Sequence, residues 1–343
     1  MDVGKLPPAL LARLLGQTRI DDPRVLLGPQ VGADAAVLDM GDRVLVAKSD
    51  PVTFAADRIG WYAVQVNAND IACLGAQPRW FLATVLLPEG APESMAEEVF
   101  GQIRDACEGL GVALVGGHTE ITYRLERPIV SGMMLGEAER ERVVWPGGAR
   151  PGDDILLTKG IAIEGTALLA RDASDTLAAR GVATSTVEEA RGLLTSPGIS
   201  VVRDATVACG AASIHAMHDP TEGGLATGLW ELAEAAGVGL EADLESVRVL
   251  PQCRAVCDAL GLDPLGLLAS GALLVVVAPD DSARVRGALE GEGIDVEVIG
   301  RVTERERGLV LRPSAEGLRD ARGAHPLPTF ARDELARFLS GGT

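Results

Sequence analysis

The densest turn cluster of the chain, at residues 146–154, constrains its fold more than any other feature. It reads Pro-Gly-Gly-Ala-Arg-Pro-Gly-Asp-Asp and stands directly before an apolar run, Ile155–Thr158, that predicts a strand. A chain of 343 residues is also too long for one ordinary hydrophobic core. The cluster therefore predicts a boundary between two domains.

Apolar patterns on both sides of this boundary predict mixed α and β structure. Before it, we expect helices at 6–15, 60–74 and from Pro92 to Gly111, and strands near 44–47, 81–87, 113–115 and 129–135. After it, we expect helices near 164–171, 187–193, 199–209, 224–236 and 281–290, strands near 273–278 and 295–301, and a weak helix at 331–339. No repeat period that would indicate a solenoid is present.

The acidic composition limits the partners of the chain. Its formal net charge of −18 offers nothing to neutralise the phosphates of a nucleic-acid strand, so no nucleic-acid partner is expected. The longest apolar stretches, such as Ala272–Ala278, are too short to cross a bilayer, and no signal-peptide pattern is present. The five cysteines are scattered, which favours small buried side chains over a zinc site or a disulfide framework. These patterns predict a cytoplasmic protein without a membrane partner.

The stretch from His218 to Ala226 concentrates groups that suit chemistry. It places an imidazole, two carboxylates and a hydroxyl before a glycine pair that opens an apolar helical pattern. Glycines at such a junction let backbone N–H groups approach an anion at the start of a helix. The stretch predicts a site for a phosphate or a carboxylate. The alternative is an ordinary helix start with Asp219 or Thr221 as the capping residue.

Asp34, Lys48 and Asp50 lie where predicted strands begin or end. Carboxylates are the hard oxygen ligands that Mg²⁺ prefers, and a lysine ammonium binds phosphate as a point charge. Together these residues suit a magnesium-bound nucleotide. The alternatives are an aspartate that satisfies a turn and a surface ion pair that contributes little.

Two further segments carry polar groups in apolar surroundings. Asn67, Asn69 and Asp70 interrupt an otherwise apolar helix, where burial is costly unless the polar groups are satisfied. A solvated helix face is the alternative. The segment 116–120, Gly-Gly-His-Thr-Glu, directly follows the strand predicted at 113–115 and is expected to form a loop that approaches a ligand closely. No P-loop, dinucleotide fingerprint or nucleophile elbow occurs in the sequence.

Taken in order, these motifs resemble those of the AIR synthase superfamily. This ATP-using group includes aminoimidazole ribonucleotide synthase, HypE-type hydrogenase maturation factors, thiamine monophosphate kinase and selenide water dikinase. The resemblance spans about residues 24–312 and is nearest to the HypE-like branch. The matching segments are VGADAAVL at 31–38, KSDPVTF at 48–54, NDIACLGAQP at 69–78, GGHTEIT at 116–122, ARPGDDILLTKG at 149–160, DPTEGGLA at 219–226 and LGLDPLGLLASGALLVVV at 260–277.

The resemblance implies a two-domain fold of the α/β plus α+β class. A helical extension at 1–23 would precede a PurM-like ATP-binding domain at 24–148, a half-barrel that pairs with a second copy and so makes a homodimer. A PurM-like α+β domain at 149–312 would cover the ATP cleft, and a tail would follow at 313–343.

The resemblance also implies residues for an ATP site. It assigns Mg²⁺ to Asp34, Asp50 and Asp70, and it places the segment from Asp219 to Gly224 at the reactive end of the nucleotide. The expected cofactor-binding residues are Lys48, Asn69, Gly117, Thr119, Glu120, Thr221, Gly223 and Gly224. The expected catalytic residues are His118, His218, Asp219 and Glu222, with either histidine moving the proton because imidazole titrates near neutrality.

The common chemistry of the family is attack of a substrate oxygen on the γ-phosphate of ATP. The resemblance therefore implies an ATP- and Mg²⁺-dependent enzyme that activates an amide, carbonyl or carboxylate oxygen of a small-molecule or protein-borne substrate, with hydrogenase maturation as one setting. Two alternatives stay open. One is a small-molecule kinase similar to thiamine monophosphate kinase, and the other is a non-catalytic nucleotide-binding partner in a metallocentre maturation complex.

Two departures from the HypE pattern bear on these alternatives. HypE proper ends in a cysteine that receives a carbamoyl group, whereas this sequence has no cysteine after Cys257. Glu222 stands where HypE usually has arginine, and His118 stands where it more often has aspartate.

Overall fold

The protein is described from a computed structural model, which places residues 6, 8–30, 32–53, 57–312 and 325–341. The chain forms two compact units. The first unit is Leu15–Val143, and the second unit is Val144–Thr343 together with Met1–Leu14. Helix α1, Pro8–Leu15, matches the helix expected at 6–15. Each unit is described by itself.

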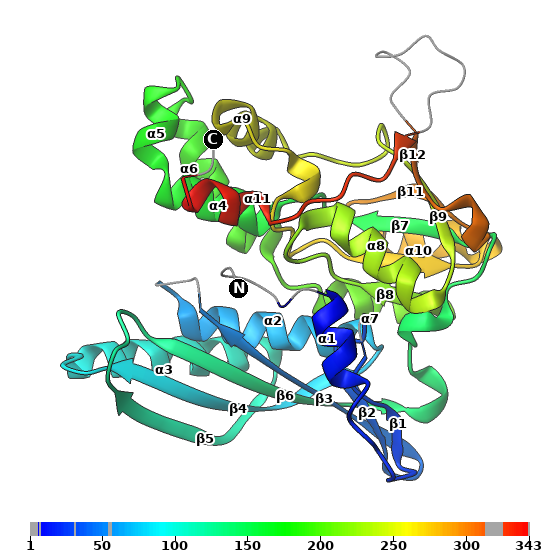
Figure 1. The fold of residues 1–343 in the computed structure, drawn as a ribbon, viewed down its shortest axis with the longest axis horizontal. Coiled ribbons are helices and arrows are strands. Elements are labelled where there is room, and N and C mark those ends of the chain that lie inside the picture. The colour runs from blue at the N-terminus through cyan, green and yellow to red at the C-terminus, as the bar shows by residue number, and fades with distance from the viewer. Residues whose placement is uncertain (1–5, 7, 31, 54–56, 313–324, 342–343) are drawn as a thin grey trace. The chain divides into compact units, whose positions relative to one another are not determined.

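The first unit contains a six-stranded sheet with the order β1-β2-β3-β6-β4-β5 (Figure 1). Neighbouring strands are antiparallel except β4 and β5, which are parallel. The strands are β1 Val25–Leu27, β2 Ala36–Asp39, β3 Arg43–Val52, β4 Gln77–Pro88, β5 Ala113–Thr122 and β6 Ile129–Glu139.

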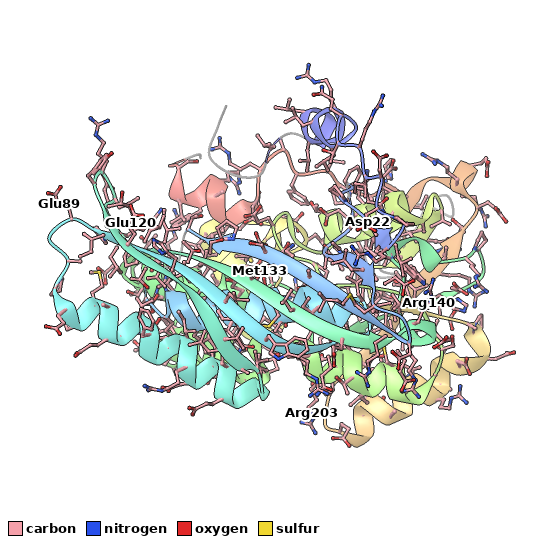
Figure 2. All side chains as sticks on the ribbon, turned by 90° about the horizontal axis from the view of Figure 1, so that it is seen from below. Asp22, Glu89, Glu120, Met133, Arg140 and Arg203 are labelled. Atoms are coloured by element: carbon pink, nitrogen blue, oxygen red, sulfur yellow. The ribbon has the colours of Figure 1, made fainter. Side chains whose placement is uncertain are left out.

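Two helices, α2 (Ile59–Cys73) and α3 (Glu93–Leu110), pack against each other and against this sheet. Glycines in β6 let α2 approach the sheet closely, because a Cβ atom at Gly132 would lie 2.5 Å from Asn67 Nδ2. Side chains of β6 alternate accordingly, with Met134 fully buried and Met133 41% exposed. One face of the sheet is thus covered by α2, and Figure 2 views the unit from the other face, where Met133 is labelled.

The second unit contains a seven-stranded sheet with the order β13-β12-β9-β11-β7-β10-β8. Its strands are antiparallel except β9 and β12, which are parallel. All four residues of β10 are buried, as expected for a strand whose sheet is covered on both faces. The strands are β7 Asp154–Thr158, β8 Ile214–His218, β9 Gly239–Asp243, β10 Leu274–Val277, β11 Val296–Thr303, β12 Leu309–Arg312 and β13 His325–Pro326.

The helices of the second unit fall into two groups. Helix α8 contributes leucines to the main core of the sheet, and α7 and α10 pack on each other. Helices α4, α5, α6 and α9 pack together as a separate cluster. The helices are α4 Ile163–Asp172, α5 Ser174–Ala179, α6 Thr184–Gly192, α7 Val202–Ala211, α8 Gly224–Ala236, α9 Pro251–Leu260, α10 Pro279–Gly291 and α11 Glu334–Leu339.

The expected two-domain α/β class is confirmed. Helix α3 ends where the sequence predicted, with Gly111 in the left-handed region at φ 66°. Cys253 and Cys257 are buried, as expected for small apolar side chains. No helix among the described residues is both long and apolar enough to cross a membrane.

Two local expectations were wrong. Residues 48–51 do not follow a strand that ends at Ala47, because β3 continues to Val52. Residues 116–120 do not form a loop, because β5 continues to Thr122. In both cases the extra length is stabilised by pairing with a long neighbour, β6 for the first and β4 for the second.

Candidate functional site

Strand β3 carries a lysine and an aspartate on its buried face. Successive strand residues point to opposite faces, so Lys48 and Asp50 share the face of Val44 and Val46, which are buried. This face packs against α2. The continuation of β3 past Ala47 therefore places two charged groups next to the helix rather than in a loop.

Helix α2 meets these groups with its own polar residues. Asn67 and Asp70, three positions apart, lie on neighbouring positions of one helix face. Asn67 is fully buried, and its Nδ2 donates hydrogen bonds to the backbone oxygens of Ala63 at 2.8 Å and Asp50 at 3.2 Å. Asn69 is also fully buried. The solvated helix face considered as an alternative for this segment is thereby excluded.

Lys48 forms ion pairs with two carboxylates. Its Nζ lies 2.9 Å from Asp70 Oδ2 and 3.7 Å from Asp50 Oδ2. The side chain of Asp70 is only 6% exposed and that of Lys48 is 19% exposed. The Lys48–Asp70 pair is therefore not the exposed surface ion pair that the sequence left as an alternative, whereas the Asp50 side chain is 42% exposed.

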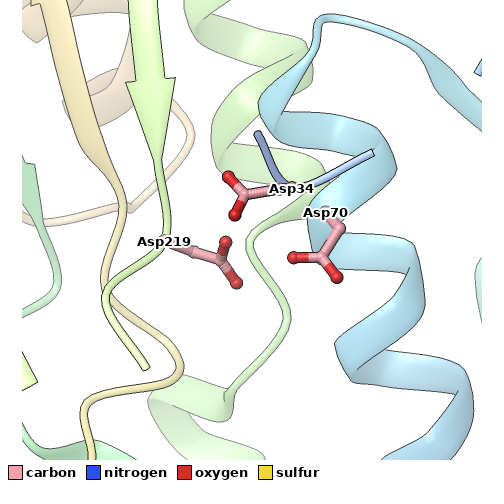
Figure 3. Close-up of side chains that lie close together, drawn as sticks. All are labelled: Asp34, Asp70 and Asp219. Atoms are coloured by element: carbon pink, nitrogen blue, oxygen red, sulfur yellow. The ribbon is translucent and has the colours of Figure 1, made fainter. Parts of the chain in front are cut away.

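Asp34, which lies two residues before β2, completes this group of charges. Asp34 and Asp70 offer carboxylate oxygen atoms within 4.8 Å of each other (Figure 3). Burial by itself would lower the pKa of Lys48, but the negative charges of Asp70, Asp50 and Asp34 outweigh it and raise that pKa above its usual value. We call Asp34, Lys48, Asp50 and Asp70 the acidic cluster.

The acidic cluster has the donor set of a site for a divalent cation and a phosphate. Three carboxylates supply hard oxygen ligands of the kind that Mg²⁺ prefers, and the Lys48 ammonium supplies a compact positive charge that suits a phosphate oxygen. The sequence predicted each of these four residues. What it did not predict is their mutual pairing.

The segment 116–120 lies in β5, an edge strand of the sheet, and is exposed. The His118 side chain is 69% exposed, and its Nε2 lies 3.7 Å from Glu120 Oε2. Gly117 approaches strand β4 closely, because a Cβ atom there would lie 2.0 Å from the Ala83 oxygen. Gly117 is therefore required by strand packing, and the predicted roles of His118, Thr119 and Glu120 toward a nucleotide stay predictions.

In the second unit, the loop after β8 leads into α8 through two left-handed glycines. Gly223 has φ 80° and Gly224 has φ 67°. A Cβ atom at Gly224 would lie 2.4 Å from the Leu265 oxygen, so no larger residue fits there. Helix α8 has no side-chain cap from its own N-cap residue, Gly223. Neither Asp219 nor Thr221, the capping residues that the sequence left as alternatives, occupies the N-cap position of α8.

A carboxylate from far along the chain binds this glycine loop. Asp333 Oδ2 accepts a hydrogen bond from the Gly223 N–H at 2.7 Å. Burial raises the pKa of Asp333 to about 6, although hydrogen bonds from the backbone of Gly223, Leu335 and Leu268 oppose the increase. The Gly223 N–H therefore binds a carboxylate of the chain itself, and the predicted site for a phosphate or carboxylate ligand stays a prediction.

Glu164, in the first turn of α4, is a second buried carboxylate beside the loop. Burial raises its pKa to about 7, a hydrogen bond with Ser270 lowers it, and the charges of Asp333, Glu222 and Asp219 raise it further. Gly165 N–H donates to the Leu268 oxygen at 3.0 Å, and this bond holds the start of α4 against the segment that contains Ser270. A carboxyl group that titrates near neutrality suits proton transfer.

The histidines of β8 are held by carboxylates. His218 is buried, and its Nε2 lies 2.9 Å from Glu231 Oε2 of α8. His215 Nδ1 lies 2.8 Å from Asp153 Oδ2. The catalytic roles predicted for His218, Asp219 and Glu222 stay predictions.

Sequence reasoning missed Glu164, Ser270 and Asp333. Asp333 lies 110 positions from Gly223 and Glu164 lies more than 100 positions from Ser270, so no local spacing relates them. One signal was available for Ser270, because it lies within the segment 260–277 that resembles the family. None was available for Asp333, which lies outside every motif.

Comparison with known protein families and structures shows two matches along the chain. The AIR synthase related protein N-terminal domain matches residues 32–138, and the C-terminal domain matches residues 150–311. The first match lies within the first unit and the second within the second unit. The order is the one that the sequence motifs predicted.

Individual relatives are similar over most of their length. The carbamoyl dehydratase HypE of Cupriavidus necator is 31% identical over 302 residues, which cover 84% of this chain and 82% of the relative. The carbamoyl dehydratase HypE of Rhodobacter capsulatus is 31% identical over 314 residues, with 89% and 87% covered. A solved structure of the hydrogenase maturation protein HypE in complex with ATP is 26% identical, with 94% and 95% covered and a TM-score of 0.70.

Proposed function

Since this chain belongs to the AIR synthase related protein family, we propose that it is an ATP- and Mg²⁺-dependent enzyme that activates a substrate oxygen by phosphoryl transfer. The observation that carries the proposal is the acidic cluster, in which the partly buried Lys48 and the buried Asp70 pair at 2.9 Å beside Asp34 and Asp50. Burial of charged side chains costs free energy of folding, so the presence of these charges under α2 indicates that they have a functional role.

The acidic cluster fits magnesium. Asp34, Asp50 and Asp70 would hold the ion through carboxylate oxygens, and the ion would neutralise charge that develops on the transferred phosphate. Lys48 would contribute a positive charge to a phosphate oxygen. Asn67 fixes the position of Asp50 through the hydrogen bond to its backbone oxygen.

We infer that the substrate carries an amide or carbamoyl oxygen. Curated relatives are named carbamoyl dehydratase, which implies removal of an oxygen atom from such a group. In the proposed reaction the substrate oxygen attacks the γ-phosphorus and the bond to the ADP oxygen breaks. The C–O bond of the phosphorylated substrate then breaks as the nitrogen forms a C≡N bond to the same carbon, and phosphate leaves with the substrate oxygen. Both protons must leave the substrate nitrogen, and Glu164, Glu222 and His218 are the candidates that accept them.

We also propose that the enzyme is a homodimer through its first unit. The sheet face that α2 does not cover carries Met133, and strand β5 exposes Leu114, Val115 and Ile121. A groove of about 420 Å³ beside β5 has an apolar lining that includes Phe100 and Leu114. An apolar strand at a sheet edge is a liability unless it is paired, and a second copy offers the same strand.

An oxygen-transfer experiment tests the proposed reaction. The protein is incubated with ATP, Mg²⁺ and a panel of carbamoyl, amide and carboxylate compounds labelled with ¹⁸O, and the released phosphate is analysed by mass spectrometry. The proposal predicts one labelled oxygen in each phosphate released with an accepted substrate. A label that stays in a phosphorylated product would instead identify a kinase. No substrate-dependent consumption of ATP across the panel would identify a nucleotide-binding partner and contradict the proposal.

A further inference from the structure

Lysine is rare in this chain, and one of its lysines lies within the acidic cluster. Of 31 lysine and arginine residues only three are lysines, at positions 5, 48 and 159. The chain thus uses arginine almost everywhere else. An ammonium is a compact point charge, whereas a guanidinium is a wide planar fork. A lysine at position 48 therefore fits where a small cation is required between carboxylates.

The charges around Lys48 require a cation at all times. Asp34, Asp50 and Asp70 carry a formal charge of −3 when ionised. Asp34 and Asp70 offer carboxylate oxygens within 4.8 Å of each other, and Asp70 is only 6% exposed, so their repulsion is weakly screened by water. Lys48 Nζ lies 2.9 Å from Asp70 and 3.7 Å from Asp50, so it interacts with both.

We propose that Lys48 is a built-in counterion that occupies the position of a divalent cation among these carboxylates when no nucleotide is bound. A nucleotide phosphate would then draw the ammonium away from Asp70, and this would free the carboxylate for the metal ion that arrives with the nucleotide. This second step rests on the proposed function, whereas the resting position of Lys48 does not. The consequence is that the protein binds a divalent cation only together with its nucleotide.

The other described lysine offers a contrast. Lys159 is also buried, and its Nζ lies 2.7 Å from the Ser200 oxygen and 3.3 Å from Asp204 Oδ1. It interacts with one carboxylate and with backbone oxygens, and Asp204 also accepts a hydrogen bond from Thr158 at 2.7 Å. Such a set holds a lysine in place but lacks the several carboxylates that a divalent cation needs. Lys159 is therefore a matched control for the loss of a buried lysine.

Binding of Mn²⁺ in the absence of nucleotide tests the proposal. Mn²⁺ is titrated into the wild-type protein and into Lys48→Met, Lys48→Arg and Lys159→Met, and free Mn²⁺ is measured by electron paramagnetic resonance. We expect Lys48→Met to bind Mn²⁺ at least about tenfold more tightly than the wild type, because removal of the ammonium leaves the carboxylates without their cation. Lys48→Arg keeps a positive charge, so it should bind Mn²⁺ more weakly than Lys48→Met. Lys159→Met lies elsewhere, so it should match the wild type.

The result that overturns the proposal is equal binding of Mn²⁺ by the wild type and Lys48→Met. If Lys48→Met does not fold, the double variant Lys48→Met/Asp50→Asn replaces it, because loss of one carboxylate restores the net charge of the cluster. It too should bind Mn²⁺ more tightly than the wild type, and failure to do so also overturns the proposal.

A second arm separates this proposal from the proposed function. ATP is added to the wild type, and Mn²⁺ retention should rise with ATP. Tight Mn²⁺ binding by Lys48→Met without any effect of ATP on the wild type would contradict the proposed function and the displacement step. It would support the resting position of Lys48.

Discussion

At the scale of single residues, the buried carboxylates of the two units have different charged surroundings. Asp70 in the first unit lies beside the ammonium of Lys48. Glu164 in the second unit lies near other carboxylates, and burial together with the charges of Asp333, Glu222 and Asp219 raises its pKa to about 7. Ionised carboxylates in the first unit suit a cation, whereas a protonated Glu164 suits proton transfer.

The raised pKa of Glu164 predicts a pH-dependent penalty on stability. In the unfolded state the pKa of Glu164 is near 4.5, the ordinary value for glutamate, and in the folded state it is about 7. The folded state therefore holds the extra proton between these values, and the free energy of unfolding falls as pH rises from 4.5 to 7. Glu164→Gln removes this loss, so its stability relative to the wild type should increase over that window by up to about 3 kcal/mol and stay constant above pH 7.

Thermal melting of both proteins between pH 4.5 and 8 measures this difference. Glu306→Gln, at an exposed position of the same unit, is the control and should follow the wild type at every pH. A difference between Glu164→Gln and the wild type that does not change with pH would show that Glu164 has the same pKa in both states.

At the scale of elements, strand length was the part of the site that the sequence predicted least well. Lys48 and Asp50 look like loop residues because a proline follows them, and Gly116 and Gly117 look like a loop because they are paired. Both segments are held in strands by register with distant partners, Asp50 opposite Gly132 and Gly117 opposite Ala83. Pairing of this kind depends on residues far away in the sequence, so local propensity cannot predict it.

The start of α8 was predicted better than the strand ends. The glycine pair at 223 and 224 lies at the beginning of the helix, as its sequence predicted, and Gly223 donates a hydrogen bond to the Asp333 carboxylate. If Glu222 and His218 act on the substrate, then Glu222→Gln and His218→Ala should leave folding and ATP affinity intact. Both should reduce substrate-dependent phosphate release by at least about a hundredfold, because proton transfer contributes in the transition state.

Turnover is compared with thermal melting and ATP binding for the same variants. Glu234→Gln, an exposed position on the same helix, should keep full turnover. If the variants lose stability in proportion to turnover, the loop before α8 has a purely structural role.

At the scale of the whole molecule, the fold class and the order of the two domains were predictable because each motif is local. The turn cluster at 146–154 lies at the division between the units, which the structure places at Val144. Strands β8 and β9 were not expected, since both are short and their sheet places them beside distant strands. The contact of Asp333 with Gly223 could not be predicted from the sequence either, because it forms only when the segment around Asp333 folds against the loop before α8.

The proposed homodimer predicts a specific effect of charge on association. Met133→Glu places a carboxylate on the uncovered face of the first sheet and should convert the dimer to monomer at micromolar concentration, because a buried charge without a partner is strongly unfavourable. Met40→Glu is the matched control, since Met40 is 61% exposed in the turn between β2 and β3. Sedimentation velocity measures both. A wild-type protein that sediments as a monomer would contradict the dimer.

The central claim is that the acidic cluster binds ATP together with Mg²⁺. Calorimetry of a non-hydrolysable ATP analogue is the most direct test, with Mg²⁺ or with EDTA, on the wild type, Asp70→Asn and the exposed control Asp105→Asn. We predict binding by the wild type and Asp105→Asn only with Mg²⁺, and at least about tenfold weaker binding by Asp70→Asn. Equal affinity with EDTA, or unchanged affinity in Asp70→Asn, would contradict the claim.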